Sequence, residues 1–403
     1  MVKWWFRRVD RNSDQHGGNV AAKPGTGQVS RAAASPAPSR AGRLHLPSGN
    51  RSSSTRLAVV AAAVTLALVG GLFLWRFIAE AGMAQQPWFS GYADVTVDPP
   101  YDLAGPGLPE SRNVTLAFVV ADSSQPCAPS WGNAYSLDAA RDALNLEQRI
   151  SALKSSGGAI AVSFGGSVNT ELAVACQDPA QLQAAYRSVV ERYSPSTIDF
   201  DIEGDALLNG PAGERRAEAV AALQKEKDGW GGGLDVWLTL PASPRGLTDD
   251  GIAVVDQMLA AGVDLAGVNI MTMNYGSSRG PSQSMLDAAV TAADSTHDQL
   301  SISYQRVGTN LSSQEIWSKM GLTPMIGVND LPDEVFGLDA ASGLNSFAVQ
   351  KGIQRVSMWS LNRDRECAAA AADGQASHVC SGVQQEPGEF ARVLAGGFEG
   401  RLR

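Results

Sequence analysis

The chain after about residue 90 alternates short apolar segments of β type with segments of helical periodicity. Eight of the apolar segments are typical of strands: residues 91–96, 114–121, 159–164, 197–202, 235–240, 267–273, 323–327 and 355–360. Alternating strands and helices favour a parallel sheet, and eight repeats fit a closed barrel of about 250 residues with insertions. We predict an α/β fold, a (β/α)8 TIM barrel over residues 91–400; an open doubly wound sheet is the alternative.

The helical segments carry recognisable start signals. Residues 179–193 follow Asp178, a good N-cap residue, and begin with Pro179, which fits the first position of a helix. Further helices are expected over residues 214–227 and 251–261. No Gly-x-Gly-x-x-Gly follows the early strands, and no phosphate-binding loop motif is present, so nucleotide-binding folds are disfavoured.

The fourth predicted strand carries a row of carboxylates. Acidic and apolar residues alternate along it, in the order Ile198, Asp199, Phe200, Asp201, Ile202 and Glu203. Because side chains alternate faces along a strand, the three acids point to one side and the three apolar residues to the other. Carboxylates at this spacing repel each other and are costly to bury. The row therefore indicates a functional site.

Three other segments end strands and would meet the acids at the same mouth, because active sites of such barrels lie at the carboxyl ends of the strands. Residues 163–166 (Ser-Phe-Gly-Gly) end strand three, and residues 271–275 (Met-Thr-Met-Asn-Tyr) end strand six. Trp359 lies near the end of strand eight.

Taken in order, the four segments resemble glycoside hydrolase family 18, the chitinase family. Its signature is Asp-Gly-x-Asp-x-Asp-x-Glu, and the last three acids match Asp199, Asp201 and Glu203. Two departures are visible: Ser196 and Thr197 replace the leading Asp-Gly, and Asn274 precedes the tyrosine where the family usually has Tyr-Asp. The resemblance covers roughly residues 88–395.

The resemblance implies a substrate-assisted mechanism, in which the 2-acetamido oxygen of the sugar is the nucleophile. Glu203 would be the general acid and then the base, and Asp201 would orient the acetamido group. Asp199 would tune Asp201, and Tyr275 would donate to the acetamido oxygen. Trp359 would form an apolar floor under the sugar.

Other residues are candidates for substrate binding, although packing is the alternative for each of them: Ser163, Gly165, Gly166, Met271, Met273, Asn274 and Trp131. We expect hydrolysis of β-1,4 bonds in chitin or chitooligosaccharides. The alternatives are a peptidoglycan or glycan N-acetylglucosaminidase and a non-catalytic, lectin-like barrel. The four histidines show no metal-ligand spacing, so no metal or cofactor is predicted.

The amino-terminal region differs in composition from the rest. Residues 1–56 contain ten basic and two acidic residues and few large apolar ones, which predicts a disordered cytoplasmic tail. The uncharged run from residue 57 to 75 predicts a transmembrane helix over 57–78, followed by a linker over 79–90. The positive-inside rule then places the enzyme domain outside a single-pass cell membrane protein. Secretion after cleavage near Ala79 is the alternative. The acidic remainder disfavours nucleic-acid binding.

The four cysteines all lie on the predicted outer side, where disulfides persist. Three pairings are possible. We favour Cys127 with Cys176 and Cys367 with Cys380, because the second pair closes a short loop and leaves the first.

Overall fold

The computed structural model describes residues 63, 65, 86–105, 109, 112–229, 233–331, 333–368 and 375–402. The chain divides into two units, and residues 7–85 form the smaller one. The predicted tail over 1–56, most of the 57–78 segment and most of the linker lie outside the described residues. The larger unit contains residues 86–403 and holds the barrel.

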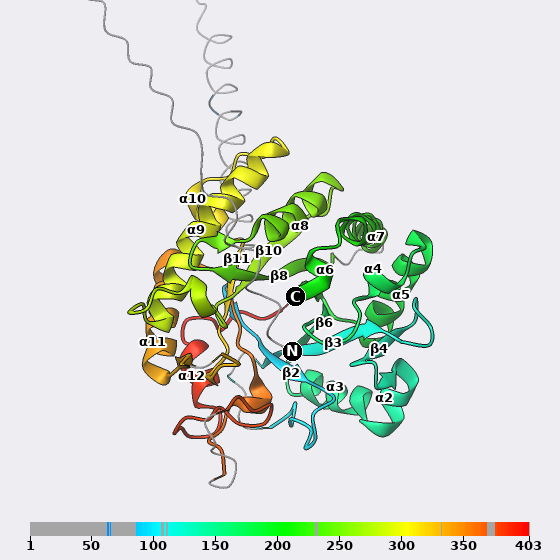
Figure 1. Ribbon diagram of the computed structural model, residues 1–403. Coiled ribbons are helices and arrows are strands. Elements are labelled where there is room, and N and C mark those ends of the chain that lie inside the picture. Colours follow the sequence, from blue (N-terminus) through cyan, green and yellow to red (C-terminus); the bar gives the residue numbers. More distant parts are fainter. Residues whose placement is uncertain are drawn as a thin grey trace, which may run out of the picture. The chain divides into compact units, whose positions relative to one another are not determined.

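The larger unit is built on a closed ring of parallel strands (Figure 1). The strands are β1 Trp88–Phe89, β2 Gly91–Asp94, β3 Asn113–Ala121, β6 Ala159–Gly165, β7 Thr197–Asp201, β8 Asp235–Ser243, β10 Leu265–Met271, β11 Met320–Thr323 and β14 Arg355–Val356. β1 and β2 are two parts of the first barrel strand, separated by Ser90. β1 pairs with β14 and β2 pairs with β3, which closes the ring. The predicted barrel is confirmed, and the open-sheet alternative is wrong.

Six of the predicted strands match the observed ones to within three residues at each end; the eighth is regular only over Arg355–Val356, and the seventh is displaced. We expected that strand over residues 323–327, and the structure places it at Met320–Thr323. Pro324 has no N–H to donate to a ladder, so regular pairing ends before it. Pro324 and Ile326 still bond to the segment after β14: Trp359 N donates to the Pro324 carbonyl oxygen at 2.9 Å, and Ile326 N donates to the Trp359 carbonyl oxygen at 3.1 Å.

Helices surround the barrel (Figure 1). They are α2 Leu137–Ala143, α3 Leu146–Ser155, α4 Leu172–Ala175, α5 Pro179–Tyr193, α6 Gly204–Leu207, α7 Gly210–Gly229, α8 Asp249–Ala260, α9 Met285–Arg306, α10 Ser313–Trp317, α11 Leu338–Lys351 and α12 Glu389–Leu394. The Asp178 side chain accepts from two backbone N–H groups of α5, so the predicted cap is confirmed. Short hairpins add β4 Pro129–Trp131 with β5 Tyr135–Ser136, and β12 Gly327–Val328 with β13 Val335–Phe336.

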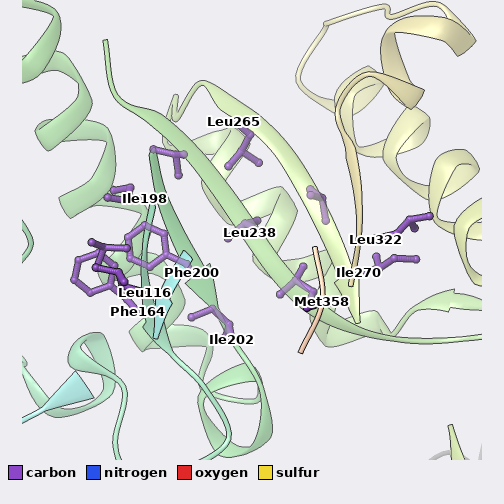
Figure 2. Packing of buried hydrophobic residues seen from close by; sticks show 14 of the residues in the cluster. Leu116, Phe164, Ile198, Phe200, Ile202, Leu238, Leu265, Ile270, Leu322 and Met358 are labelled. Carbon is purple, nitrogen blue, oxygen red and sulfur yellow. The ribbon is translucent and has the colours of Figure 1, made fainter. Parts of the chain in front are cut away.

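The main apolar core lies between the barrel and its helices (Figure 2). The apolar residues of β7 point into it, and Phe200 stacks on Phe164 of β6 with ring centroids 5.3 Å apart. Tyr186 of α5 packs edge-on against both rings. This packing fixes which face of β7 points outward, so the acids must point into the barrel.

The prediction of a transmembrane helix over residues 57–78 is wrong for the chain as the structure describes it. Among the described residues, which include only Ala63 and Thr65 of that segment, no helix combines the length and apolar character needed to cross a membrane. The longest described helices, α7 and α9, have 20 and 22 residues but carry charged side chains. Length without a continuous apolar surface does not make a membrane span.

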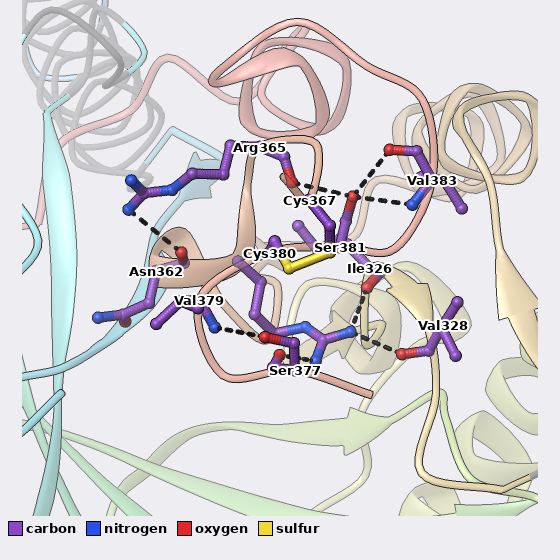
Figure 3. Close-up of a disulfide and its surroundings, with 11 residues drawn as sticks. Ile326, Val328, Asn362, Arg365, Cys367, Ser377, Val379, Cys380, Ser381 and Val383 are labelled. Carbon is purple, nitrogen blue, oxygen red and sulfur yellow. Dashed lines mark hydrogen bonds between the residues drawn. A yellow bond between two sulfur atoms is a disulfide. The ribbon is translucent and has the colours of Figure 1, made fainter. Parts of the chain in front are cut away.

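Both predicted disulfides are present. Cys127–Cys176 joins the loop before β4 to the end of α4, and Cys367–Cys380 closes a loop near the carboxyl terminus (Figure 3). The first pair is separated by 49 residues and the second by 13. A longer closed loop removes more entropy from the unfolded chain.

We therefore predict that Cys127→Ala/Cys176→Ala lowers the free energy of unfolding by about 4 kcal/mol, and Cys367→Ala/Cys380→Ala by about 3 kcal/mol. Urea unfolding of the oxidised full chain measures both. An equal or reversed order would show that native packing, and not loop length, controls the loss.

Candidate active site

The three acids of β7 rise from the barrel interior to its mouth. Asp199 is fully buried and Asp201 is 6 % exposed, while Glu203 is partly exposed. Glu203 follows the strand in extended backbone and precedes the short helix α6. The alternation of faces therefore continues to the third acid, and the structure brings the three predicted acids together.

Asp199 is held by side chains from four other strands. Its Oδ2 accepts hydrogen bonds from Tyr92 Oη on β2 at 2.9 Å and from Ser163 Oγ on β6 at 2.7 Å. Its Oδ1 accepts from Thr239 Oγ1 on β8 at 2.6 Å and from Arg355 Nη1 on β14 at 2.7 Å. Four donors, one of them charged, satisfy the buried carboxylate and fix its position.

Arg355 is the counter-charge of the acid row. It is fully buried, pairs with Asp199 and also donates to the Tyr92 hydroxyl at 2.9 Å. Its guanidinium lies over the rings of Trp88, Tyr92 and Trp237, at 5.3 to 5.5 Å from their centroids. Sequence reasoning missed Arg355 and Tyr92. An arginine at the start of an apolar strand is the sequence signal that could have identified Arg355.

The two upper acids favour their protonated forms. Burial raises the pKa of Asp201 well above its usual range, and the negative charges of Glu203 and Asp199 raise it further, against the opposing effect of Arg355. Burial, with a contribution from the charge of Asp330, raises the pKa of Glu203 to about 7. A carboxyl group with this pKa can donate a proton near neutral pH and accept one later.

An aromatic wall borders the acids. The rings of Trp359 and Phe118 stack with centroids 5.4 Å apart, and Tyr92 lies 6.1 Å from each. Trp359 and Phe118 are partly exposed, so solvent reaches part of each side chain. Phe118 lies within β3, the second barrel strand, and sequence analysis overlooked it because one phenylalanine in an apolar strand resembles core.

The Ser-Phe-Gly-Gly segment, residues 163–166, contacts the acid row and Phe118. Ser163 is fully buried and bonds to Asp199. Gly165 and Gly166 have positive φ; a Cβ on Gly165 would meet the Asp201 carbonyl oxygen at 2.1 Å, and one on Gly166 would meet the Phe118 ring at 2.8 Å. These glycines allow the close approach of Asp201 and Phe118. The structure thus shows packing contacts for all three residues.

Tyr275 is buried at the end of β10, and its backbone N–H donates to Glu334 Oε2 at 2.9 Å. Its hydroxyl is buried and has no hydrogen-bond partner among the described residues. Burial, together with the charge of Glu334, raises the pKa of Tyr275 well above its usual range, so the phenol keeps its proton. The Tyr275 hydroxyl can therefore donate a hydrogen bond, and no described residue accepts it.

The structure places the remaining predicted substrate-binding residues either at the mouth of the barrel or in the core. Met271 is nearly buried, and Met273 and Asn274 are partly exposed after β10. Trp131 lies on β4, is fully buried, and donates from Nε1 to the Tyr193 hydroxyl at 2.9 Å. The structure therefore places Trp131 in the core between β4 and α5, and not on a surface that a substrate can reach.

The sequence of the chain is similar to those of two curated proteins. The chain is 36 % identical over 312 residues to a protein of Escherichia coli (strain K12) named "Probable bifunctional chitinase/lysozyme", covering 72 % of this chain and 33 % of that protein. It is 35 % identical over 313 residues to "Endochitinase 11" of Metarhizium anisopliae, covering 72 % of this chain and 57 % of that one. The domain is similar in sequence to proteins that are named as chitinases. No protein-family model matches the chain.

The solved structures agree with this relationship. A chitinase catalytic domain from Pyrococcus furiosus superposes with a TM-score of 0.66 and 28 % identity, over 78 % of this chain and 97 % of that domain. Together, the relatives support a chitinase-type glycoside hydrolase. The chain spans one third to somewhat over half of the length of the two curated relatives.

We predict that Arg355→Leu destabilises the protein by about 3–5 kcal/mol, because it leaves the Asp199 charge buried without a partner. The double variant Asp199→Asn/Arg355→Leu removes both charges, so its loss should be smaller than the sum of the two single losses. Urea unfolding of the four proteins measures the coupling. Additive losses would contradict the role of the ion pair.

Proposed function

We propose that this protein hydrolyses β-1,4 bonds in chains that contain N-acetylglucosamine, with retention of configuration. One observation carries the proposal: Asp201 Oδ1 and the Tyr275 hydroxyl are both buried without a partner in the described part of the chain. A buried polar atom without a partner is costly. An acetamido group supplies what each lacks, since its N–H can donate to Asp201 and its carbonyl oxygen can accept from Tyr275.

The arrangement supports a substrate-assisted reaction. Glu203 gives its proton to the glycosidic oxygen while the acetamido oxygen attacks C1, so that the C1–oxygen bond breaks and a cyclic oxazolinium ion forms. Glu203, now ionised, takes a proton from a water molecule that adds to C1 and reopens the ring. Asp201 accepts the hydrogen bond from the acetamido N–H, which becomes more polar in the oxazolinium ion, and the stacked Trp359 and Phe118 rings lie under the sugar.

The pKa of Glu203 sets the direction of the pH dependence. The acid must be protonated to act, and its pKa is raised to about 7. Turnover is therefore supported at pH values below about 7 and declines as the pH rises through that value.

Two observations bear on the substrate. Catalytic-site mutants of active domain 2 of a Pyrococcus furiosus chitinase were solved in complex with chito-oligosaccharides, which favours chitin-type chains. The Escherichia coli relative is named a chitinase/lysozyme, which keeps peptidoglycan as the second candidate substrate.

Two disulfides are consistent with a protein that works in an oxidising compartment outside the cytoplasm.

We expect the parent protein to cleave N-acetylglucosamine tetramers, and Glu203→Gln to lower kcat by about 10²-fold or more, because the amide has no proton to transfer. Parallel incubations with chitin oligomers and with peptidoglycan distinguish the two substrates. NMR detection of the product anomer shows whether the configuration is retained. Binding of oligomers without turnover by the parent would indicate a lectin-like barrel. Product of inverted configuration would exclude the assisted mechanism.

Tyr275→Phe tests the acetamido contact. The buried hydroxyl has no partner among the described residues, so its removal should leave the free energy of unfolding unchanged or raise it by about 1 kcal/mol. Turnover of N-acetylglucosamine oligomers should fall about 10²-fold, because a donor to the developing charge is lost. An unstable variant with normal turnover would contradict this role.

A further inference from the structure

The backbone that carries Tyr275 has an alternating conformation. Asn274 and Gly276 lie in the left-handed region, with φ of 52° and 53°, while Tyr275 between them is right-handed, with φ −70° and ψ −29°. Consecutive right- and left-handed residues turn their N–H groups to one side and form a concavity that binds an anion. The loop after β10 therefore presents a place for a negatively charged group directly at Tyr275.

Glu334, from the β12–β13 hairpin and its connecting loop over residues 329–334, supplies that charge. Its Oε2 accepts from the Tyr275 N–H at 2.9 Å and its Oε1 accepts from the Gly276 N–H at 2.7 Å. Glu334 is 1 % exposed, and Arg279 Nε lies 3.8 Å from its Oε1. Two N–H donors and a nearby guanidinium thus compensate the buried carboxylate.

Two further contacts join the same hairpin to the residue before Tyr275. The Asn274 N–H donates to Asn329 Oδ1 at 3.3 Å, and Asn274 Nδ2 donates to Asp330 Oδ2 at 2.9 Å. Side chains of the connecting loop therefore accept from three consecutive backbone N–H groups, those of residues 274, 275 and 276.

The hairpin is itself held at its base, near the Cys367–Cys380 disulfide (Figure 3). Val328 N donates to the carbonyl oxygen of Ser381, the residue after Cys380, at 2.7 Å. The Arg363 guanidinium donates to the Val328 carbonyl oxygen at 2.6 Å. The support on which the loop after β10 rests is therefore fixed independently of Tyr275.

The other end of the Tyr275 side chain has no such support. Its hydroxyl has no hydrogen-bond partner among the described residues. The place of the hydroxyl therefore depends on the packing of the ring and on the backbone at residue 275. Glu334 is the side chain that bonds to that backbone N–H.

We propose that Glu334 is a positioning residue, which directs the Tyr275 hydroxyl toward the acetamido group of the substrate by holding the N–H groups of Tyr275 and Gly276. The proposal rests on the role of Tyr275 proposed above. Misplacement of a reacting or stabilising group by about 1 Å can lower a rate about 10²-fold. A buried residue behind Tyr275 can therefore control turnover.

Glu334→Gln tests the proposal with almost no change in size. The amide keeps one acceptor oxygen, but its NH2 group faces the second backbone N–H, so one hydrogen bond is replaced by a contact between two donors. We expect kcat on N-acetylglucosamine tetramers to fall about 10-fold. Asp333→Asn is the matched control. It removes the same charge from an exposed position of the same loop, where a φ of 66° suits asparagine, and should leave kcat unchanged.

A double-mutant cycle tests whether the effect passes through Tyr275. In Tyr275→Phe the hydroxyl that Glu334 would position is absent, so adding Glu334→Gln should lower kcat by less than about twofold more. Equal losses of kcat in the two backgrounds would overturn the proposal, and so would an unchanged kcat in Glu334→Gln alone.

NMR of the full chain with ring-13C tyrosine gives a second readout that needs no turnover. Tyr275→Phe assigns the Tyr275 signal. Glu334→Gln should shift or broaden this signal, and Asp333→Asn should not change it. An inactive parent would refute the proposed function, whereas an unchanged Tyr275 signal in Glu334→Gln would overturn the positioning role.

Glu334→Asp keeps the test decisive if Glu334→Gln folds poorly, which the Tm of each variant shows. Aspartate keeps the charge but is shorter by one methylene, so its oxygens withdraw from the two N–H groups. It should move the Tyr275 signal and lower kcat, and the loss of kcat should again vanish in Tyr275→Phe. A lower Tm with neither change would show that Glu334 only stabilises the fold.

Discussion

The buried ion pair between Asp199 and Arg355 is the interaction on which the site depends. It lies inside the barrel, where an isolated charge of either sign is costly, and Arg355 completes it by contacting three aromatic rings. With Asp199 neutralised from β14 and hydrogen-bonded from β2, β6 and β8, the acids above it meet little further compensation. Protonation of Asp201 and Glu203 therefore costs less free energy than ionisation, and a protonated Glu203 would supply the acid of the proposed hydrolysis.

The site can be understood as three layers with different tasks. Behind the acids, Gly165 and Gly166 allow the backbone and the Phe118 ring to approach closely. At the proposed sugar site, Asp201 and Tyr275 present polar atoms without protein partners in the described chain, and the stacked Trp359 and Phe118 rings would lie under the sugar. Above, the β12–β13 hairpin fixes Asn274 and Tyr275 through Asn329, Asp330 and Glu334. Each layer comes from a different set of strand ends.

Much of the barrel could be predicted because its signals are local. Alternation of apolar and acidic residues along β7 determines which face is buried, and Asp178 with Pro179 marks the start of α5. The seventh strand was misplaced because Pro324 ends the ladder inside an otherwise apolar run. The apolar segment over 57–78 was given a membrane role from hydropathy alone, and no described helix fits such a role.

What could not be predicted depends on contacts between distant parts of the chain. Arg355 is 156 residues from Asp199, and Asp330 is 56 residues from Asn274. Nothing in the spacing of these residues indicates a pair. Trp131 illustrates the reverse case, since an aromatic residue in a loop resembled a sugar contact and is instead buried against Tyr193.

Asp201 and Tyr275 each have a buried polar atom without a partner among the described residues, and we propose that an acetamido group binds to both. The most direct measurement is a crystal structure of Glu203→Gln with a bound N-acetylglucosamine tetramer. We predict that the acetamido N–H of the sugar next to residue 203 lies within hydrogen-bond distance of Asp201, its oxygen within that distance of the Tyr275 hydroxyl, and that the oxygen lies against C1. A sugar bound with its acetamido group turned away from both residues would contradict the claim.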